Sequence, residues 1–465
     1  MNSYQENFKN EQEVIWKVTL KKVLYLLIYF LSPLIPILVI YLPMVPFYNS
    51  NPLYLVSLIC GSAAFVWIAY EFILISKPKF IEKTFGLDKF YAFHGIMAII
   101  SVLLIFVHRT ILEEKFEANT EILLGNLSFY IFIGITILAL LLIYSTVILK
   151  LKPILRFKRF LIKHSIFTYT NQVLIHNIVI CAYILMFIHV MLAPTVKGNN
   201  LVIGTYTLFF IIGALFYIYH TIIKKLLLRR NLYTVNMVIK ESDNMWTLKL
   251  TPDNKKIFFY KPGQFSYIKV LGKSVKSETH PFSMSSSPLT KAELFFSVKA
   301  LGDFTNTIGN VLPGEKVEVD GPYGKFSYLD YKEENSTIII AGGVGITPVL
   351  SMLRYMAKAD KNRNVILFWG INNTKDLICN QEILNYEKKM KGFHFIPVMF
   401  KEESWPGEKG IIDREKLERF LELYKVDLKT AGYYICGPGV MTDGVLKTLK
   451  SMNIKKSKLH FEKFS

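Results

Sequence analysis

Six apolar segments, each long enough to cross a lipid bilayer as a helix, occupy the first half of the 465-residue chain. A helix of about 20 apolar residues spans a hydrocarbon core of roughly 30 Å. Inside lipid the backbone must satisfy its own hydrogen bonds, so this half is expected to fold as a bundle of membrane helices. The predicted spans are residues 23–43, 52–76, 90–112, 121–149, 171–193 and 202–223.

The loops between these segments alternate in charge. Basic residues cluster at 77–89, 150–163 and 224–230, whereas the loops between these clusters are acidic or neutral. By the positive-inside rule the basic loops and both termini are cytoplasmic, and we expect a multi-pass protein of the plasma membrane. Topology and anionic lipid explain much of the net charge of +19, so no nucleic-acid partner is expected.

Four histidines lie inside the apolar segments in two pairs: His94 and His108 in the third span, and His176 and His189 in the fifth. The members of each pair are 14 and 13 residues apart, which is roughly 20 Å along a helix. Both spans run from inside to outside, so His94 matches His176 near the inner end and His108 matches His189 near the outer end. Imidazoles from two helices suit the axial positions of a haem iron. The spacing therefore predicts two stacked haems.

The fifth span fits this scheme less simply than the third. At about 100° per residue, 14 residues return a helix to within about 40° of the same face, but 13 residues leave it about 140° away. We therefore expect the fifth span to bend, to widen a turn or to present its imidazoles from different angles. Histidines buried for packing alone are the alternative interpretation, but two pairs in register favour haem.

Other polar residues near the spans have less specific interpretations. Arg109 directly follows His108; it suits a haem propionate or an anionic or electron-accepting species outside, or a snorkelling interfacial role. Glu71 is expected to snorkel to the cytoplasmic face. His164 is expected in a cytoplasmic loop, and His220, near the inner end of the sixth span, is not expected to ligate haem.

The second half has the pattern of a small antiparallel barrel followed by an α/β lobe. Turns at Pro262-Gly263 and Pro313-Gly314 separate strand-like runs. The strands predicted for the barrel are Tyr233–Lys240, Met245–Thr251, Gln264–Val270, Glu293–Ala300 and Lys316–Asp320.

The α/β lobe begins with a pattern that favours a phosphate. An apolar strand, Ser336–Ala341, leads into the glycine-rich segment 342–348 and then into a helical pattern. Glycines let backbone N–H groups approach a pyrophosphate, and the helix N-terminus favours its charge. A later strand, Gly432–Ile435, ends at Cys436-Gly437-Pro438. Parallel βαβ order places a nucleotide at the carboxyl ends of such strands.

The soluble half resembles the ferredoxin–NADP reductase superfamily, and residues 20–465 resemble the NADPH oxidase and ferric reductase membrane family, including its bacterial members. In that family two histidines on the third span and two on the fifth ligate two b-type haems, and His94, His108, His176 and His189 occupy these places. The resemblance implies three domains: a six-helix transmembrane bis-haem bundle at 1–230, an FAD-binding β-barrel at 231–332 and an NAD(P)H-binding α/β domain at 333–465.

The flavin motif of the family is His-Pro-Phe-Ser/Thr, which occurs here at residues 280–283. The resemblance implies that Ser283 lies near the flavin N5 atom and that the preceding residues line the flavin and its phosphates. The flavin-binding residues implied in this way are His280, Pro281, Phe282 and Ser283, with Gly302, Asp303 and Thr305 in a second phosphate turn.

The nucleotide motifs of the family also have counterparts. The NADPH pyrophosphate loop corresponds to Gly342, Gly343, Gly345, Thr347 and Pro348, and the nicotinamide-side motif to Cys436, Gly437 and Pro438. Family members end in an aromatic ring that covers the flavin until nicotinamide displaces it. Phe464 is the candidate for this ring, and Phe461 is expected to be a core residue.

The chain departs from the family pattern after the strand Asn364–Gly370. Many family members carry an arginine there that binds the 2′-phosphate of NADPH. Asn372 is neither that arginine nor the acid that binds an NADH ribose. Lys375 or Lys401 is a candidate source of the charge, and a solvated surface lysine is the alternative for each. We expect NADPH to be preferred, with NADH possible.

The resemblance implies electron transfer from NADPH through FAD and two haems to an outside acceptor, with Arg109, Ser283, Cys436 and Phe464 at the reacting sites. Oxygen, giving superoxide, is the leading expectation for the acceptor. A ferric or cupric chelate reductase with the same electron path is an alternative, and a cytochrome-type electron carrier that serves a partner protein is a further one. No EF-hand or Pro-rich tail is visible, so no obligatory protein activator is expected.

Overall fold

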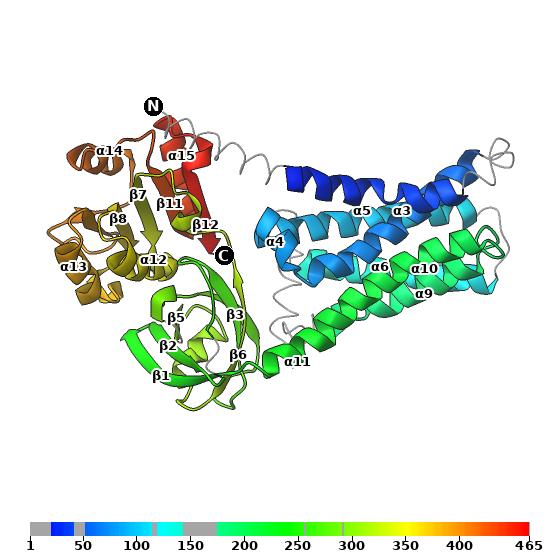
Figure 1. The fold of residues 1–465 in the computed structure, drawn as a ribbon, viewed down its shortest axis with the longest axis horizontal. Coiled ribbons are helices and arrows are strands. Elements are labelled where there is room, and N and C mark those ends of the chain that lie inside the picture. The colour runs from blue at the N-terminus through cyan, green and yellow to red at the C-terminus, as the bar shows by residue number, and fades with distance from the viewer. Residues whose placement is uncertain are drawn as a thin grey trace. The chain divides into compact units, whose positions relative to one another are not determined.

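The computed structural model describes residues 20–40, 52–113, 119–142, 174–254, 257–290 and 293–464. The chain divides into two compact units, Met1–Lys225 and Leu226–Ser465 (Figure 1). The predicted basic loop at 150–163 and His164 lie outside the described residues.

Within its described residues, the first unit supplies six helices that are long and apolar enough to cross a membrane. A short helix, α4 (Lys79–Phe85), joins the second and third of them, and η1 (Tyr219–Ile223) and α11 (Lys224–Arg229) continue the sixth. The six helices are Leu20–Ile40, α3 (Pro52–Ile75), α5 (Leu87–Glu113), α6 (Thr120–Leu142), Leu174–Leu192, which includes α9 (Val179–Leu192), and α10 (Asn200–Ile218). Each predicted span therefore has a corresponding helix.

These helices are apolar on more faces than the protein covers. The buried share of their apolar windows runs from 50% in Pro52–Ile75 down to 17% in Thr120–Leu140. Large apolar side chains such as Leu103, Leu123 and Leu208 are more than half exposed. An apolar helix that is not covered by protein needs another apolar medium, so this unit is compatible with a membrane bundle.

The bundle is held by close packing between sequence-distant helices. Helix α3 packs along α5 and α10, and α6 packs along α9. Phe65 of α3, Tyr183 of α9 and Phe209 of α10 meet in one buried cluster. The Tyr183 hydroxyl donates to the Phe209 carbonyl oxygen at 3.1 Å, so this ring is fixed at both ends.

The helix Leu174–Leu192 resolves its 13-residue spacing by tightening a turn. The amides of Ile178 and Cys181 bond to carbonyl oxygens three residues earlier, at 3.1 and 2.9 Å, and Ile180 does the same at 3.3 Å. Bonds of this kind give 3.0 residues per turn, or about 20° more rotation per residue than an α-helix. This extra rotation brings His189 toward the face that carries His176. The widened turn offered as one option from the sequence is therefore wrong.

The second unit begins with a six-stranded antiparallel sheet in the order β4-β3-β6-β1-β2-β5. An isolated antiparallel bridge between Met284 and Phe296 joins its two outer strands and closes it as a barrel. One strand, β4, was not predicted, because its Pro281 argues against a strand. The six strands are β1 (Tyr233–Ser242), β2 (Met245–Pro252), β3 (Phe265–Val270), β4 (Thr279–Ser283), β5 (Leu294–Lys299) and β6 (Lys316–Tyr323).

A parallel sheet follows, in the order β10-β9-β8-β7-β11-β12. Its central strand β7 is buried at every position, as its run of isoleucines requires. Its strands are β7 (Ser336–Gly342), β8 (Asn364–Ile371), β9 (Phe393–Met399), β10 (Glu408–Lys409), β11 (Gly432–Pro438) and β12 (Leu459–Phe464).

Helices cover both faces of this sheet. Helix α12 (Ile346–Ala359) and α13 (Asn380–Lys389) bury one face, and α14 (Arg414–Leu423) and α15 (Gly439–Ser451) bury the other. The chain builds outward from β7 through β8 and β9, and then returns to place β11 on the other side of β7. In such sheets a ligand binds where the order reverses, beyond the carboxyl ends of the strands. This reversal lies between β7 and β11.

Candidate functional site

Two segments of the barrel that are separate in the sequence lie together at the predicted flavin site. The β4 pairing sets Ser283 opposite Phe265 and His280 opposite Ile268. The His280 ring stacks on the buried ring of Phe304, with centroids 4.2 Å apart. The flavin motif therefore lies against the turn that carries the second set of predicted phosphate contacts.

That turn, residues 301–305, is closed by its own threonine. The Thr305 hydroxyl oxygen accepts from the backbone N–H groups of Leu301 and Gly302, each at 2.9 Å. Asp303 is exposed at its tip, whereas Phe304 points inward and is buried. The turn thus presents polar atoms to solvent beside His280, an arrangement that suits the phosphates of a flavin.

The nucleotide loop is packed directly against the end of β11. Gly342 ends β7, and residues 343–345 form a single 3₁₀ turn before α12 begins at Ile346. A Cβ atom on Gly345 would lie 2.0 Å from the carbonyl oxygen of Cys436, so only glycine fits there. Thr347 and Pro348 are buried in the first helical turn. The two predicted motifs therefore meet at the reversal point of the sheet.

Cys436 and Phe464 lie on neighbouring strands at this edge. Cys436 is fully buried, and burial raises the pKa of its thiol well above the usual value. The thiol therefore stays protonated at neutral pH. Phe464 pairs with Pro438 in the β11–β12 register and is half-buried. Phe461 is 48% exposed, so its assignment as a core residue is wrong.

The residues proposed to select the nucleotide lie close to one another. The Lys401 amide donates to the Asn372 carbonyl oxygen at 2.8 Å, and both side chains are exposed beyond the ends of β8 and β9. Lys375 is also exposed, and its amide donates to the Asn373 side chain at 3.1 Å. All three positions face solvent at the edge where a nucleotide would bind.

One arginine ties the nucleotide lobe to the flavin barrel. Arg354 of α12 donates to the Ser285 carbonyl oxygen at 2.7 Å and forms a two-pronged ion pair with Glu382 at 2.8 and 2.6 Å. Burial alone would raise the pKa of Glu382, but hydrogen bonds from Arg354 and its charge lower that pKa below the usual value. Ser351, one turn earlier, donates to the Ser286 carbonyl oxygen at 2.6 Å. These contacts begin two residues after Ser283.

In the other unit, the four histidines form two facing pairs. The ring centroids of His94 on α5 and His176 are 6.3 Å apart, and those of His108 on α5 and His189 on α9 are 6.2 Å apart. These are the pairs that the spacing predicts. Since His94 precedes His108 and His176 precedes His189, the two helices run parallel.

The separation of the rings fits one metal ion per pair. A nitrogen lies about 1.1 Å from the centre of an imidazole ring, given ring bonds of about 1.33 Å, and a metal–imidazole bond is about 2 Å long. Two imidazoles on opposite sides of one metal ion therefore have centroids about 6.2 Å apart. A haem needs only two protein ligands. Structural zinc takes four, and the described residues contain no group of three or more His, Cys, Asp or Glu side chains that could hold a metal ion.

The backs of three of these rings are held. The Nδ1 atom of His108 lies 2.9 Å from the Ser57 carbonyl oxygen, and that of His189 lies 2.9 Å from the Glu121 carbonyl oxygen. Because a carbonyl only accepts, Nδ1 donates and Nε2 keeps the free lone pair. The Ser57 hydroxyl also lies 2.9 Å from Nδ1 of His108, and it donates to the His108 carbonyl oxygen at 3.1 Å. The Nδ1 atom of His94 contacts the Glu71 carboxylate. Such partners orient metal-binding imidazoles.

Two glycines let neighbouring helices approach the outer pair. A Cβ atom on Gly61 of α3 would lie 2.8 Å from Nδ1 of His108, and one on Gly125 of α6 would lie 2.9 Å from Nδ1 of His189. Any larger residue at either position would push the ring away from its place.

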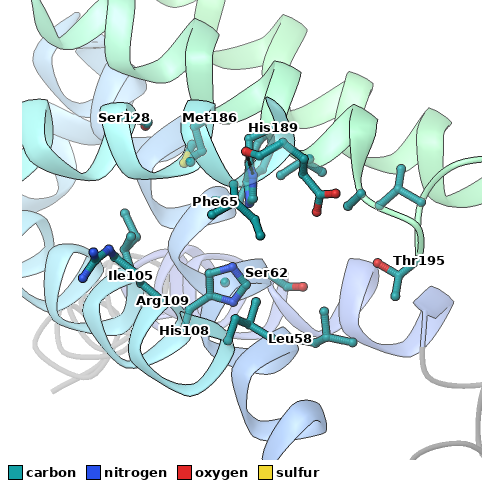
Figure 2. A pocket seen from close by; sticks show the side chains of 18 of the residues that line it. Leu58, Ser62, Phe65, Ile105, His108, Arg109, Ser128, Met186, His189 and Thr195 are labelled. Atoms are coloured by element: carbon teal, nitrogen blue, oxygen red, sulfur yellow. Dashed lines mark hydrogen bonds between the residues drawn. The ribbon is translucent and has the colours of Figure 1, made fainter. Parts of the chain in front are cut away.

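A cavity of about 390 Å³ borders the outer pair. Figure 2 shows the His108 and His189 rings on opposite sides of it. Arg109 also borders this cavity, and its guanidinium donates to the Asn126 side chain at 2.7 Å and to the Tyr130 hydroxyl at 3.2 Å. The arginine is therefore positioned by α6 beside the outer pair.

Sequence reasoning misplaced one of these residues and missed others. Glu71 is 9% exposed and contacts His94, so the expectation that it snorkels to the surface is wrong. A carboxylate and a histidine are each costly in an apolar segment unless they meet, and this signal could have paired them. Ser57, Gly61 and Gly125 gave no such signal, because their role depends on which helices are neighbours.

Comparison with known proteins assigns the second unit. Residues 228–327 match the FAD-binding domain family, and residues 339–447 match the oxidoreductase NAD-binding domain family. The reductase component of propane 2-monooxygenase from Mycolicibacterium goodii is 28% identical over 228 residues, which are 47% of this chain and 63% of that protein. The electron transfer component of xylene/toluene monooxygenase from Pseudomonas putida is 30% identical, over 47% of this chain and 60% of that protein.

A solved structure of a ferredoxin NADP+ reductase from Neisseria gonorrhoeae with bound FAD and NADP is 19% identical, covers 50% of this chain and 97% of its own, and gives a TM-score of 0.42. The chain spans about three fifths of the length of the two curated relatives named above. Both domain matches lie within Leu226–Ser465. This unit therefore contains an FAD-binding domain and an oxidoreductase NAD-binding domain.

Replacement of Arg354 should impair hydride transfer without loss of flavin. In the Arg354→Ala variant, the nucleotide lobe loses its tie to the segment that follows Ser283, and a displacement of about 1 Å between reacting groups can cost about 100-fold in rate. We expect the NADPH-dependent reduction of ferricyanide by the full chain to fall by about tenfold or more, with bound FAD unchanged. The matched control is Arg414→Ala, which removes an exposed arginine paired with Glu418 on α14. Equal rates in the two variants would refute a positioning role.

Proposed function

We propose that this protein is a transmembrane oxidoreductase that passes electrons from cytoplasmic NADPH through FAD and two b-type haems to oxygen on the outer side, where superoxide forms. One observation carries this proposal: two parallel helices face each other with two histidine pairs whose rings are 6.3 and 6.2 Å apart. The residues of each pair lie about 20 Å from those of the other pair along the helix. An electron path of this length covers most of a bilayer.

The residues of the chain have distinct tasks in this proposal. Segment 342–348 and Cys436-Gly437-Pro438 bind the nucleotide at the reversal of the parallel sheet. The segments 280–283 and 301–305 hold the flavin on the barrel, and Phe464 covers it. When bound, NADPH supplies a hydride, FAD divides its two electrons and the haems carry them singly. Nothing in this path carries a proton across the bundle.

We place the six helices in the plasma membrane with both termini in the cytoplasm. Lys77 lies between α3 and α4, Lys79 and Lys83 lie in α4, and the basic residues 224–230 follow α10. This distribution supports the orientation by the positive-inside rule. With the cytoplasm negative, each outward electron is helped by about 2.3 kcal/mol per 100 mV. The orientation therefore matches the direction of electron flow that the reductase unit requires.

The acceptor site is assigned to the cavity beside His108 and His189. His108 and His189 would hold a haem beside this cavity, and the haem would supply single electrons to an acceptor there. Arg109 borders the cavity as a positioned cation and favours a product or substrate with negative charge. Superoxide meets this condition, and so does an anionic ferric chelate, which makes chelate reduction the second candidate.

The haem content is the first test. We expect the purified full chain, supplied with haem during expression, to show low-spin b-type spectra with two haems per chain, in reduced-minus-oxidised difference spectra. His94→Ala or His176→Ala should remove one haem, and His108→Ala or His189→Ala the other. An intact chain without Soret absorption would end the proposal.

The glycine contacts give a subtler test. In Gly125→Ala the new methyl group would lie 2.9 Å from Nδ1 of His189, so the ring must move and the outer site should lose haem. We expect the Soret absorbance per chain to fall toward half. The control is Gly134→Ala on the same helix, where a Cβ atom meets nothing within 4 Å; its haem content should equal that of the wild type. If both variants keep two haems, the role given to Gly125 is wrong.

The acceptor is tested with two assays at equal NADPH. Purified chain with FAD and no other protein should reduce an external dye in air, and superoxide dismutase should abolish most of that signal. Anaerobic ferric-chelate reduction should be slower. Fast anaerobic iron reduction without a dismutase-sensitive signal would favour the chelate reductase. Activity that appears only after a second protein is added would favour an electron carrier that serves a partner.

A further inference from the structure

The two histidine pairs differ in what lies behind their rings. At the outer pair both Nδ1 atoms meet backbone carbonyl oxygens, of Ser57 and of Glu121, each at 2.9 Å. At the inner pair the Nδ1 atom of His94 instead contacts the carboxylate of Glu71. The same ring therefore has a neutral acceptor at one site and an acidic side chain at the other.

Glu71 is fixed in this position by the first and second helices. Its side chain is buried, and its other carboxylate oxygen accepts from the Tyr29 hydroxyl at 3.2 Å. Tyr29 is held in turn by the Trp67 indole, which donates to the Tyr29 carbonyl oxygen at 3.2 Å and stacks on its ring. A chain of contacts thus runs from the bundle core to His94 through Trp67, Tyr29 and Glu71.

The acceptor behind a ligating imidazole tunes the metal that the imidazole binds. A carboxylate takes more of the Nδ1 proton than a carbonyl does, so the ring becomes a stronger donor to the metal. A stronger donor stabilises the oxidised metal ion more than the reduced one and lowers the reduction potential. The difference between the inner and the outer acceptor should therefore separate the potentials of the two sites.

We propose that Glu71 is a positioning residue that orients His94 and makes the inner haem the lower-potential member of the pair. This inference rests on the proposed function, since it requires both haems. One electron then leaves the inner iron, which is oxidised, and arrives at the outer iron, which is reduced, with no bond or proton exchanged between them. The difference in acceptors makes this step downhill toward the outer side of the bundle.

The test is a spectroelectrochemical titration of the haem-loaded full chain. In Glu71→Gln the carboxylate becomes an amide, whose carbonyl oxygen is the same kind of acceptor that His108 and His189 already have. We expect the lower of the two midpoint potentials to rise by about 59 mV. For a one-electron couple this is a tenfold change in the equilibrium constant. The higher potential should stay near its wild-type value. Measurement of Glu71→Gln in the His108→Ala background, which should keep only the inner haem, assigns the shift.

A matched control separates contact from charge. Glu121→Gln makes the same chemical change near the outer pair, but His189 bonds to the backbone of Glu121 and not to its side chain. We expect a much smaller shift there, and none at the inner site. Equal shifts in the two variants would mean that only the local charge matters, and would overturn the inference.

A second variant keeps the test decisive if Glu71→Gln binds haem poorly. Tyr29→Phe removes the hydroxyl that donates to Glu71 and leaves the carboxylate to His94 alone. The lower potential should then fall, opposite in sign to the first shift. An unchanged or raised lower potential in Tyr29→Phe, or an unchanged one in a two-haem Glu71→Gln protein, would refute the role of Glu71 and leave the proposed function standing. A wild-type chain that binds no haem would refute the proposed function itself.

Discussion

The first unit is organised around the distance between two imidazole rings on parallel helices. Centroids 6.2 and 6.3 Å apart match the separation of two imidazoles that bind one metal ion. Contacts from other helices hold the rings from behind. Helix α3 does this for His108 through Ser57, α6 does it for His189 through Glu121, and Glu71 does it for His94. Gly61 of α3 and Gly125 of α6 let these helices come close enough to support the rings of the outer pair.

The second unit also depends on a close approach between segments, here between backbone atoms. Its nucleotide loop and the end of β11 approach so closely that Gly345 has no room for a side chain. The lobe is then tied to the barrel through Arg354 and Ser351, which bond to the carbonyl oxygens directly after the flavin motif. Hydride transfer requires two ring systems at a fixed separation. Hydrogen bonds to main-chain carbonyl oxygens and the partly exposed ion pair between Arg354 and Glu382 supply rigidity where loops alone would not.

Features that depend on spacing along the chain could be predicted from the sequence. Features that depend on contacts between distant segments could not. The six spans, the pairing of histidines and most strands follow from periodicity, loop charge and turn residues. Strand β4 escaped because Pro281 argues against it, and the tight turn at Ile178 escaped because a 13-residue spacing can be accommodated in several ways. Glu71 was predicted to reach the cytoplasmic surface, because a single acidic residue near a helix end usually snorkels. Only the arrangement of helices in space shows that it meets His94.

These two levels of organisation bear on the direction of the electron flow that we propose. A membrane potential favours outward movement of electrons, but it acts along the whole path and does not distinguish one carrier from the next. Local chemistry does distinguish them. Ligands of one kind, histidine on both sides, would give two similar sites if their surroundings were alike. The carboxylate behind His94 and the carbonyls behind His108 and His189 break that equivalence. Under the proposed function, identical ligands would hold both haems and different neighbours would order their potentials, so the buried Glu71 carboxylate would help to set the direction of electron transfer.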